Sequence, residues 1–288
     1  MTVDSPTVGR GSAPTANPVE LVVAGAAGRM GTRIVALARE SSDLHVGAAL
    51  EMAGHPALGG DAGELAGGSR LGVTLGADAS AAITRPRVLV EFSVPAASLE
   101  HLRLVAAAGA RAVIGTTGFS AAQREEIAAL ARRAPIMLAP NMSVAVTLAF
   151  KLLPIMARAL GDDYDVEITE IHHRFKKDAP SGTAVRMAEL VAEALGRDLD
   201  KTGVYGREGL PGERTRQEIG VMSLRSGDVV GEHTVSFGTL GERLELTHRA
   251  TSRQNFATGA LRAARFVAQC RAQGRHGLFD MSDVLGFR

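Results

Sequence analysis

The first half of the chain alternates short apolar runs with segments of helical periodicity. The apolar runs that predict buried strands lie at 21–24, 46–50, 88–92, 112–115 and 136–139. Apolar positions recur at helical spacing over 29–39, over 98–108 and from 120 to about 133. Strands that alternate with helices in this way form βαβ units, so this half predicts a Rossmann-type doubly wound parallel sheet. The glycine-rich stretch 52–76 supports no assignment.

A different pattern begins beyond Met142. A long, mostly apolar segment at 144–160 predicts a helix that only Pro154 interrupts. Alternating polar and apolar residues predict strands with one solvated face at 165–171, 218–224, 232–237 and 243–248. Amphipathic helices are predicted at 184–195 and, after a Ser252 cap, at 256–269. This half therefore predicts an α+β domain with a mixed, mostly antiparallel sheet and helices on one face.

These patterns predict an α/β chain of two domains behind a short tail. The first domain is expected at 19–142, completed by the C-terminal segment 252–288, and the second at 143–251. Residues 1–18 are rich in Ser, Thr, Pro and Gly and lack the apolar core of a secretory signal, so we expect a disordered tail.

Composition excludes several classes of protein. A formal net charge of +1 and the lack of a basic run with interleaved aromatics argue against a nucleic-acid surface. No stretch approaches the roughly 18–20 uninterrupted apolar residues of a membrane span. The single cysteine, Cys270, excludes an internal disulfide framework and a multi-thiolate metal site, and its apolar helical setting favours a buried packing role. We expect a cytoplasmic protein that binds no metal, nucleic acid or membrane.

A glycine motif lies between the first predicted strand and helix. Gly25, Gly28 and Gly31 form G-x-x-G-x-x-G, which suits a tight turn, a backbone approach to a pyrophosphate and close helix packing. Glu51 follows the second predicted strand, where an acidic residue accepts hydrogen bonds from the adenosine ribose. The alternative is a phosphate-free turn beside a surface glutamate. Since Met52 rather than a cation follows Glu51, the motif favours NADH over NADPH, although Arg29 lies near in sequence.

Two further segments follow predicted strands of the same sheet. Gly115, Thr116 and Thr117 follow one strand, and residues 139–142 follow the next. The carboxyl ends of such strands are where ligands bind. Either segment alone could be an ordinary turn, but their shared position favours contacts with a nicotinamide ribose and amide.

The segment 170–183 concentrates titratable groups at the start of a helix. It contains His172, His173, three cations and a Pro-Ser-Gly-Thr helix start. Histidine exchanges protons near neutral pH, cations hold anionic groups, and free amides at a helix start bind anions. A lone histidine on a strand is more often structural, and we interpret His233 and His248 in that way. Beside a dinucleotide motif, the corner predicts a reductase. Arg243 is an open candidate for an anionic pocket.

The motifs together resemble the dihydrodipicolinate reductase family, also called 4-hydroxy-tetrahydrodipicolinate reductase, of bacterial and plant lysine synthesis. The matching segments are 23–31, 61–67, 114–119, 141–144, 172–183, 227–234 and 241–248. The corner H-H-R-x-K-x-D-A-P-S-G-T is highly specific to that family. Two positions depart from the common pattern: Phe175 stands where many members carry histidine, and Ser93 where many carry threonine.

The resemblance implies a chemistry and a set of roles. Enzymes of this family deliver hydride from a nicotinamide to C4 of a cyclic imine dicarboxylate, with overall loss of water. The resemblance makes His172 the general acid and Lys176 a proton donor and countercharge; His173, Gly182 and Thr183 would bind substrate. The implied cofactor contacts are Gly25, Ala26, Ala27, Gly28, Arg29, Met30, Glu51, Gly115, Thr116, Thr117, Ala139, Pro140, Asn141 and Met142. It also implies a homotetramer.

Two rival functions remain open at this point. Another two-domain oxidoreductase acting on amino or imino acids would keep the glycine motif but has no reason to keep the His172–Lys176 pair. A catalytically silent NAD(H) sensor on the same fold would be expected to have lost both groups.

Overall fold

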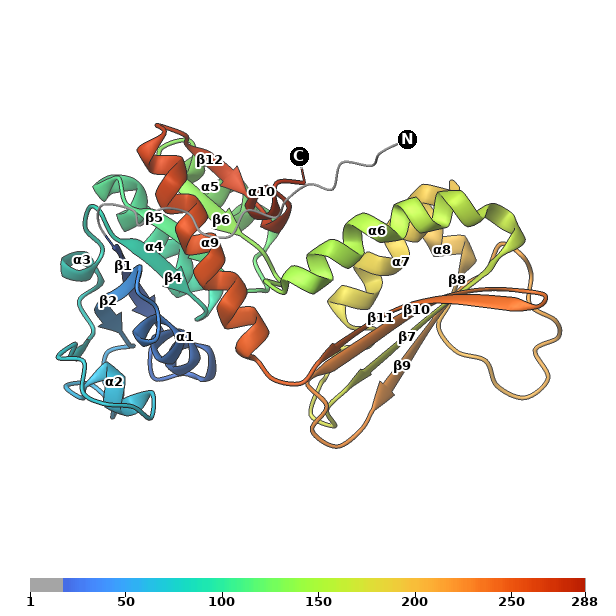
Figure 1. Cartoon of the computed structure of the whole chain (residues 1–288), viewed down its shortest axis with the longest axis horizontal. Coiled ribbons are helices and arrows are strands. Elements are labelled where there is room, and N and C mark those ends of the chain that lie inside the picture. The colour runs from blue at the N-terminus through green and yellow to red at the C-terminus, as the bar shows by residue number, and fades with distance from the viewer. Residues whose placement is uncertain (1–17, 288) are drawn as a thin grey trace, which may run out of the picture. The chain divides into compact units, whose positions relative to one another are not determined.

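The computed structural model describes residues 18–287, so the tail predicted at 1–18 lies outside the described residues except for Pro18. Contacts divide the chain into two units (Figure 1). Unit 1 is the chain up to Leu138 together with Ala260–Phe279, and unit 2 is Ala139–Gly259 together with the end of the chain from Asp280. This division differs from the expected bounds at residues 139–142 and at both ends of 252–288.

Unit 1 is built on a seven-stranded, wholly parallel sheet in the order β12-β6-β5-β4-β1-β2-β3. Its strands are β1 (Val19–Ala24), β2 (Leu44–Leu50), β3 (Leu75–Gly76), β4 (Val88–Glu91), β5 (Arg111–Ile114), β6 (Pro135–Leu138) and β12 (Gly277–Phe279). Its helices are α1 (Arg29–Arg39), α2 (Ala62–Leu65), α3 (Ala79–Ala82), α4 (Pro95–Ala108), α5 (Ala121–Ala131) and most of α9 (Gln254–Ala272). The predicted doubly wound sheet is confirmed.

The central strand shows why the apolar runs are continuous. Leu21, Val22 and Val23 of β1 are all fully buried, because helices cover both faces of the sheet. The strand order reverses between β1 and β4, which is the switch point where such sheets bind ligands at the carboxyl ends of the strands.

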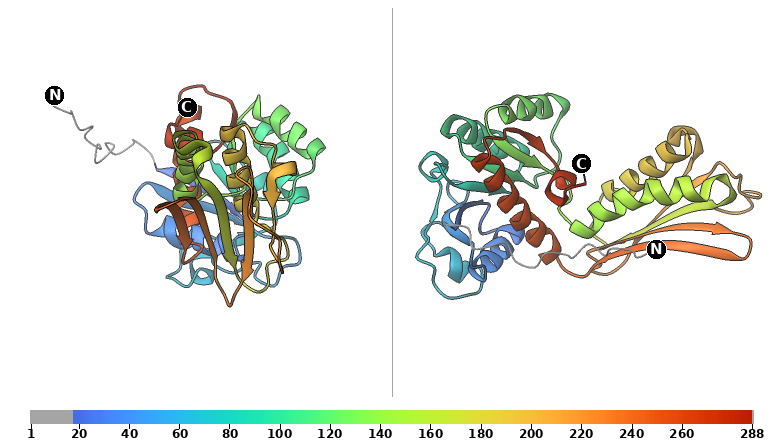
Figure 2. Two further views of the ribbon diagram at one scale, coloured as in Figure 1. Left: turned by 90° about the vertical axis from the view of Figure 1, so that its right-hand side faces the viewer. Right: turned by 45° about the horizontal axis from the view of Figure 1, so that its top comes forward.

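Unit 2 contains a five-stranded sheet in the order β11-β10-β7-β9-β8. Its strands are β7 (Asp165–His172), β8 (Gly203–Val204), β9 (Ile219–Arg225), β10 (Gly231–Thr239) and β11 (Glu242–Ala250). Its helices are α6 (Val144–Leu160), the short 3-10 helix η1 (Gly161–Asp163), α7 (Gly182–Leu195), α8 (Leu199–Thr202) and α10 (Met281–Leu285). Both α6 and α7 lie along one face of the sheet (Figure 2).

The second sheet is mixed, as predicted, but two of its pairings are parallel and two antiparallel. Strand β10 pairs antiparallel with β7 and β11, whereas β9 pairs parallel with β7 and β8. The chain leaves β7, crosses over through α7 and re-enters the sheet in the same direction. Such a crossover imposes parallel pairing, which alternation within each strand does not reveal.

Helix α6 runs without a break through Pro154, contrary to the predicted interruption. Among the described residues, one helical segment, Val144–Asp163, is long and apolar enough to cross a membrane by length and composition alone. Leu153 and Ala157 of this segment belong to the same buried cluster as Val166 and Ile168 of β7. We therefore interpret it as a core helix of unit 2.

Candidate active site

The predicted corner lies at the end of β7 and the start of α7, within unit 2. Ser181 caps α7, and its side-chain oxygen accepts a hydrogen bond from the Ala184 amide at 3.2 Å. Gly182 and Thr183 are the first helical residues, so their amides have no partner within the helix. The space where a Gly182 side chain would lie is open, with no atom within 4 Å. The helix start can therefore receive an anionic group.

The His172 ring is held by a buried carboxylate. Its Nδ1 lies 2.5 Å from Oε2 of Glu170, whose side chain is fully buried. The same carboxylate receives two hydrogen bonds from Arg225, at 2.9 and 3.0 Å. Burial lowers the pKa of His172, and the Glu170 carboxylate partly offsets that effect. Burial opposes the charged form of Glu170, but hydrogen bonds from Arg225 and His172 keep its pKa below the usual value.

One of the three remaining histidines near the corner, His233, is buried. The His233 ring packs edge-on against that of His172, with centroids 5.2 Å apart, and its Nε2 lies 2.9 Å from the Ser181 hydroxyl. Burial lowers the pKa of His233 to about 3, so the ring is neutral. His248 lies 6.3 Å from His233 between ring centroids. His173 is half-buried, and its Nδ1 has no hydrogen-bond partner among the described residues.

The Lys176 ammonium group is engaged by a neighbouring carboxylate. It donates to both Asp178 oxygens, at 2.9 and 2.8 Å. The Asp178 side chain is 61% exposed, whereas that of Lys176 is 20% exposed. A second carboxylate entering from solvent could replace the Asp178 contact.

The glycine motif in unit 1 forms the tight turn that the sequence predicts. Gly25 adopts a left-handed φ of +65°, and its carbonyl accepts a hydrogen bond from the Gly28 amide at 2.9 Å. A side chain on Gly31 would place its Cβ 2.2 Å from the Gly25 oxygen, so only glycine fits there. Gly28 caps α1 without a side-chain hydrogen bond, which leaves the helix amides available to a phosphate. The Ala27 amide donates to Oε2 of Glu51 at 3.3 Å, which places the predicted ribose-binding carboxylate beside the turn.

Part of the predicted segment 115–117, which follows β5, packs against other residues of unit 1. A Cβ on Gly115 would lie 2.1 Å from the Phe92 ring, and the buried Thr116 hydroxyl accepts a hydrogen bond from Ser98 at 2.9 Å. Thr117 is exposed. The Thr117 side chain and the local backbone are thus the groups that a ligand can reach.

The predicted segment 139–142 belongs to unit 2, as does the corner at 170–183. The Asn141 amide nitrogen donates to the Thr183 hydroxyl at 3.2 Å, and its oxygen accepts from the Ser143 amide at 2.9 Å. Ala139 and Met142 are buried, and Pro140 is exposed. The structure therefore joins this segment to the start of α7.

Arg243 does not join the corner. It lies on β11 opposite Gly238 of β10, and it pairs with Glu245 at 3.0 Å on the face of the sheet that α6 and α7 leave uncovered.

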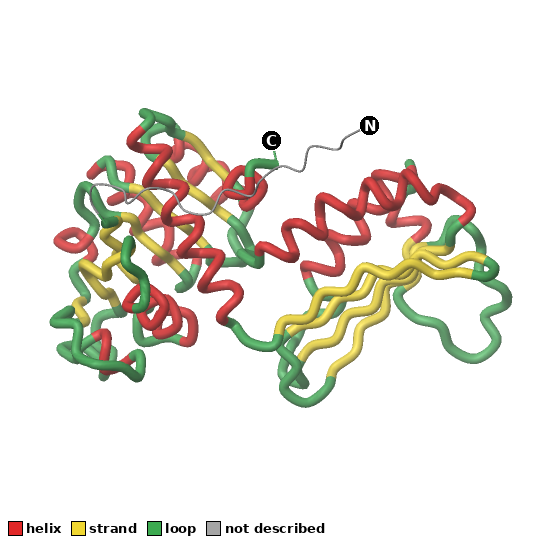
Figure 3. Tube along the Cα trace, viewed as in Figure 1, coloured by secondary structure: helices red, strands yellow, loops and turns green. Residues whose placement is uncertain are grey.

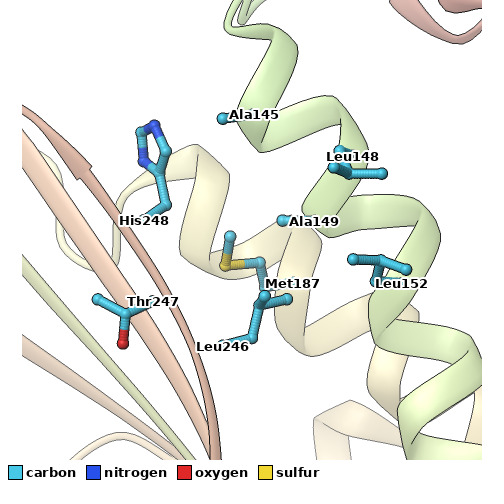
Figure 4. Close-up of a pocket in the computed structure, with 8 residues that line it drawn as sticks. All are labelled: Ala145, Leu148, Ala149, Leu152, Met187, Leu246, Thr247 and His248. Carbon is cyan, nitrogen blue, oxygen red and sulfur yellow. The ribbon is translucent and has the colours of Figure 1, made fainter. Parts of the chain in front are cut away.

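A pocket of about 190 Å³ lies between α6, α7 and β11 (Figure 4). Its lining is apolar except for Thr247 and His248, and none of the residues predicted to bind substrate lines it. Among the described residues, no group of three or more His, Cys, Asp or Glu side chains could hold a metal ion.

Comparisons with known proteins decide the family. The family described as dihydrodipicolinate reductase, N-terminus, matches residues 19–142, and that described as dihydrodipicolinate reductase, C-terminus, matches residues 145–285. The chain belongs to the dihydrodipicolinate reductase family.

Curated relatives in this family carry the name 4-hydroxy-tetrahydrodipicolinate reductase. That of Syntrophus aciditrophicus (strain SB) is 51% identical over 270 residues, covering 94% of this chain and 99% of the relative. That of Anaeromyxobacter dehalogenans (strain 2CP-1 / ATCC BAA-258) is 52% identical over 270 residues, covering 93% and 98%. The predicted family and the predicted enzyme class, an NAD(P)H-dependent reductase, are thereby confirmed.

Solved structures agree on the fold of the dihydrodipicolinate reductase family. A dipicolinate-bound dihydrodipicolinate reductase from Paenisporosarcina sp. TG-14 has a TM-score of 0.71 at 24% identity, covering 91% of this chain and 97% of that one. An amine dehydrogenase from Mycobacterium smegmatis has a TM-score of 0.56 at 15% identity, covering 92% and 96%.

The sequence motifs did not predict a role for two residues of the corner, Glu170 and Arg225. A signal for Glu170 was present. Every second residue of β7 faces the core, namely Val166, Ile168 and Glu170. A carboxylate therefore occupies a position where the alternation predicts an apolar residue. Nothing local marks Arg225, because its role depends on the parallel pairing of β9 with β7.

Proposed function

We propose that this chain reduces (2S,4S)-4-hydroxy-2,3,4,5-tetrahydrodipicolinate, by way of dihydrodipicolinate, to tetrahydrodipicolinate in lysine and diaminopimelate synthesis. The main support is that one buried carboxylate, that of Glu170, is hydrogen-bonded both to His172 and to the Ser181 amide at the start of α7. A proton-transfer group and an anion-binding helix start are thereby held together. That arrangement suits a cyclic substrate that carries two carboxylates and must be protonated after hydride addition.

The residues of unit 1 fit a nicotinamide dinucleotide. The uncapped start of α1 and the Gly25–Gly28 turn suit a pyrophosphate, and Glu51 suits a ribose diol. When bound, the reduced nicotinamide supplies the hydride for C4 of the substrate. We propose contacts from 25–30, Glu51, 115–117 and 139–142, with NADH favoured because no cation follows Glu51 to receive a 2′-phosphate.

The residues of the corner protonate and bind the substrate. Hydride addition to a conjugated imine leaves an enamine-like species that needs a proton, and His172 in its imidazolium form supplies it. Since Nδ1 bonds Glu170, Nε2 is the nitrogen that delivers the proton. Lys176 offsets the two carboxylates and can donate a proton, and His173 contacts the substrate. The Gly182 and Thr183 amides and the Thr183 hydroxyl receive one carboxylate.

Assembly and location complete the proposal. We propose a homotetramer formed through the face of the second sheet opposite α6 and α7, which bears no helix among the described residues (Figure 3). Leu224 of β9, which lies on that face opposite Ile171 of β7, is a large apolar residue that remains 46% exposed. Light scattering after gel filtration tests this, and a monomer at micromolar concentration would contradict it. We also propose that the enzyme works in the cytoplasm and binds neither nucleic acid nor membrane.

The decisive experiment follows NADH oxidation with substrate generated in situ by dihydrodipicolinate synthase. His172→Gln and Lys176→Ala should each lose at least about 100-fold in kcat, given the usual contribution of general acid catalysis. NADH affinity, measured by fluorescence, should stay unchanged. Lys177→Ala is the matched control, since Lys177 is exposed at the same corner. Wild-type rates in both variants would contradict the assignment, and a wild type that binds NADH without turnover would favour the sensor alternative.

A further inference from the structure

The corner contains a buried carboxylate that the proposed chemistry does not use directly. Glu170 lies on β7 with its side chain fully buried, on the same face as Val166 and Ile168. A carboxylate in such surroundings costs several kcal/mol unless charged partners and hydrogen bonds compensate it. A purely structural role would be served at lower cost by an apolar residue.

The Glu170 carboxylate has a bonded partner at every acceptor position. Oε2 receives Nδ1 of His172 at 2.5 Å and Nη1 of Arg225 at 2.9 Å. Oε1 receives the Ser181 amide at 3.1 Å and Nη2 of Arg225 at 3.0 Å. Arg225 also donates to the Asp178 carbonyl at 2.6 Å, which holds the loop that carries Lys176. One carboxylate thus connects the acid, the helix start and the loop.

The contact determines which nitrogen of His172 carries a hydrogen. An ionised carboxylate only accepts, so Nδ1 must be the donor in both the neutral and the cationic ring. Nε2 remains as the exchanging site, and Gly231 keeps it accessible, because a Cβ at that position would lie 3.0 Å from Nε2.

Charged and titratable groups face His172 from every neighbouring element. Glu170 raises its pKa, while Lys176 on the loop and Arg225 on β9 lower it. His233 on β10 lies against the ring and is neutral, and Asp178 is occupied by Lys176. Glu170 is thus the group that opposes burial and two cations, which together still lower the pKa of His172.

We propose that Glu170 is the positioning residue of this active site, because it fixes the tautomer and orientation of His172. Through the Ser181 amide and Arg225 it also holds the start of α7 and the Lys176 loop in place beside His172. The inference rests on the proposed role of His172 as the acid. It assigns no contact between Glu170 and substrate.

The test combines activity with a readout that is independent of turnover. Deuterium exchange at histidine C2, followed by mass spectrometry across pH, gives the midpoint for His172 in the full-length enzyme. Glu170→Gln should move that midpoint down by about one pH unit or more, since it removes a hydrogen-bonded negative charge. The falling limb of kcat against pH should move with it, and kcat at pH 7.5 should fall by about 10- to 100-fold. Glu170→Asp, which keeps the charge, should recover part of both effects.

Glu167→Gln is the matched control. Glu167 lies on the same strand and also pairs with an arginine, Arg207, through two hydrogen bonds at 3.1 and 2.8 Å, but its side chain points to the opposite face. Its pH profile and the His172 midpoint should match the wild type.

The outcomes separate this inference from the proposed function. A folded Glu170→Gln enzyme that binds NADH and keeps both the wild-type midpoint and the wild-type pH profile would overturn the positioning role. If Glu170→Gln does not fold, an unmoved midpoint and profile in Glu170→Asp would overturn it equally. A wild type without reductase activity, or full activity in His172→Gln, would instead reject the proposed function, while the exchange midpoints would still report whether Glu170 controls His172.

Discussion

The side-chain amide of Asn141 donates a hydrogen bond to the hydroxyl of Thr183 across 3.2 Å. The first residue is proposed to contact the cofactor and the second the substrate. Both belong to unit 2, so this contact joins the 139–142 part of the proposed cofactor set to the proposed substrate set within one compact body. Binding at either set should therefore be sensitive to the other.

Thr183→Val tests that link. The variant keeps the shape of the side chain but removes the hydroxyl that would bind a carboxylate and receive Asn141. We expect KM for the dicarboxylate substrate to rise by about 10- to 100-fold, because hydrogen bonds to charged groups contribute about 1.5–3 kcal/mol. KM for NADH should rise by a smaller factor. Steady-state kinetics with each substrate varied in turn measures both, and Thr183→Ser should restore them. Unchanged constants in Thr183→Val would remove the hydroxyl from the proposed site.

The contact between Lys176 and Asp178 predicts a competition. The substrate must replace Asp178 as the partner of the ammonium group, and the carboxylate of Asp178 is largely exposed. Asp178→Asn should lower KM for substrate by about 1.4- to fivefold, which corresponds to the 0.2–1 kcal/mol of an exposed ion pair. Initial rates at low ionic strength would show the effect most clearly, because salt screens such pairs. A higher KM would mean that Asp178 supports the bound state.

Buried His233 predicts a loss of stability in mild acid. Its folded pKa is about 3, whereas an unfolded histidine titrates near 6.5. Between these values the unfolded chain binds the extra proton, so stability falls as the pH falls from about 6.5 towards 3. Between pH 7 and pH 5 the cost reaches up to about 2 kcal/mol from this group. Thermal unfolding at both pH values should show a smaller decrease in Tm for His233→Gln than for wild type.

The control for that measurement is His45→Gln. His45 is exposed on β2, so its removal should leave the pH dependence of Tm unchanged. Equal decreases in the wild type and His233→Gln would show that His233 does not carry the effect.

Cofactor selectivity should depend on Glu51. Its carboxylate receives the Ala27 and Met52 amides at 3.3 and 3.0 Å, so it is fixed beside the glycine turn. We expect kcat/KM to be higher with NADH than with NADPH. Glu51→Gln should reduce that ratio by about fivefold or more, because it removes the negative charge that would repel a 2′-phosphate. A wild-type preference for NADPH would contradict the prediction.

The elements that sequence predicts well are those with several periods of pattern. Leu21, Val22 and Val23 are buried on both faces of a parallel sheet, and the continuous apolar run shows it. Helices α2 and α3 have four residues each, about one turn, so they carry no periodicity to detect. Pro154 is accommodated inside α6 because the helix packs its apolar face on the sheet, and packing overrides local preference.

The candidate site shows the same limit. His172, Lys176 and the Gly182–Thr183 start are adjacent in sequence, so one motif carries them. Arg225 lies 55 residues beyond its partner Glu170, and only sheet pairing brings the two together. A local motif cannot encode a contact of that range.

The bidentate pair of Glu170 and Arg225 has a consequence for how sequences of this kind can diverge. Loss of Arg225 alone would leave the fully buried Glu170 carboxylate without its cationic partner, a defect that costs several kcal/mol, and loss of Glu170 alone would leave the partly buried Arg225 guanidinium without its carboxylate. We therefore expect substitutions at positions 170 and 225 to occur together in related sequences. Substitutions that appear singly across related genes should avoid both positions, and a library for directed evolution should vary them jointly.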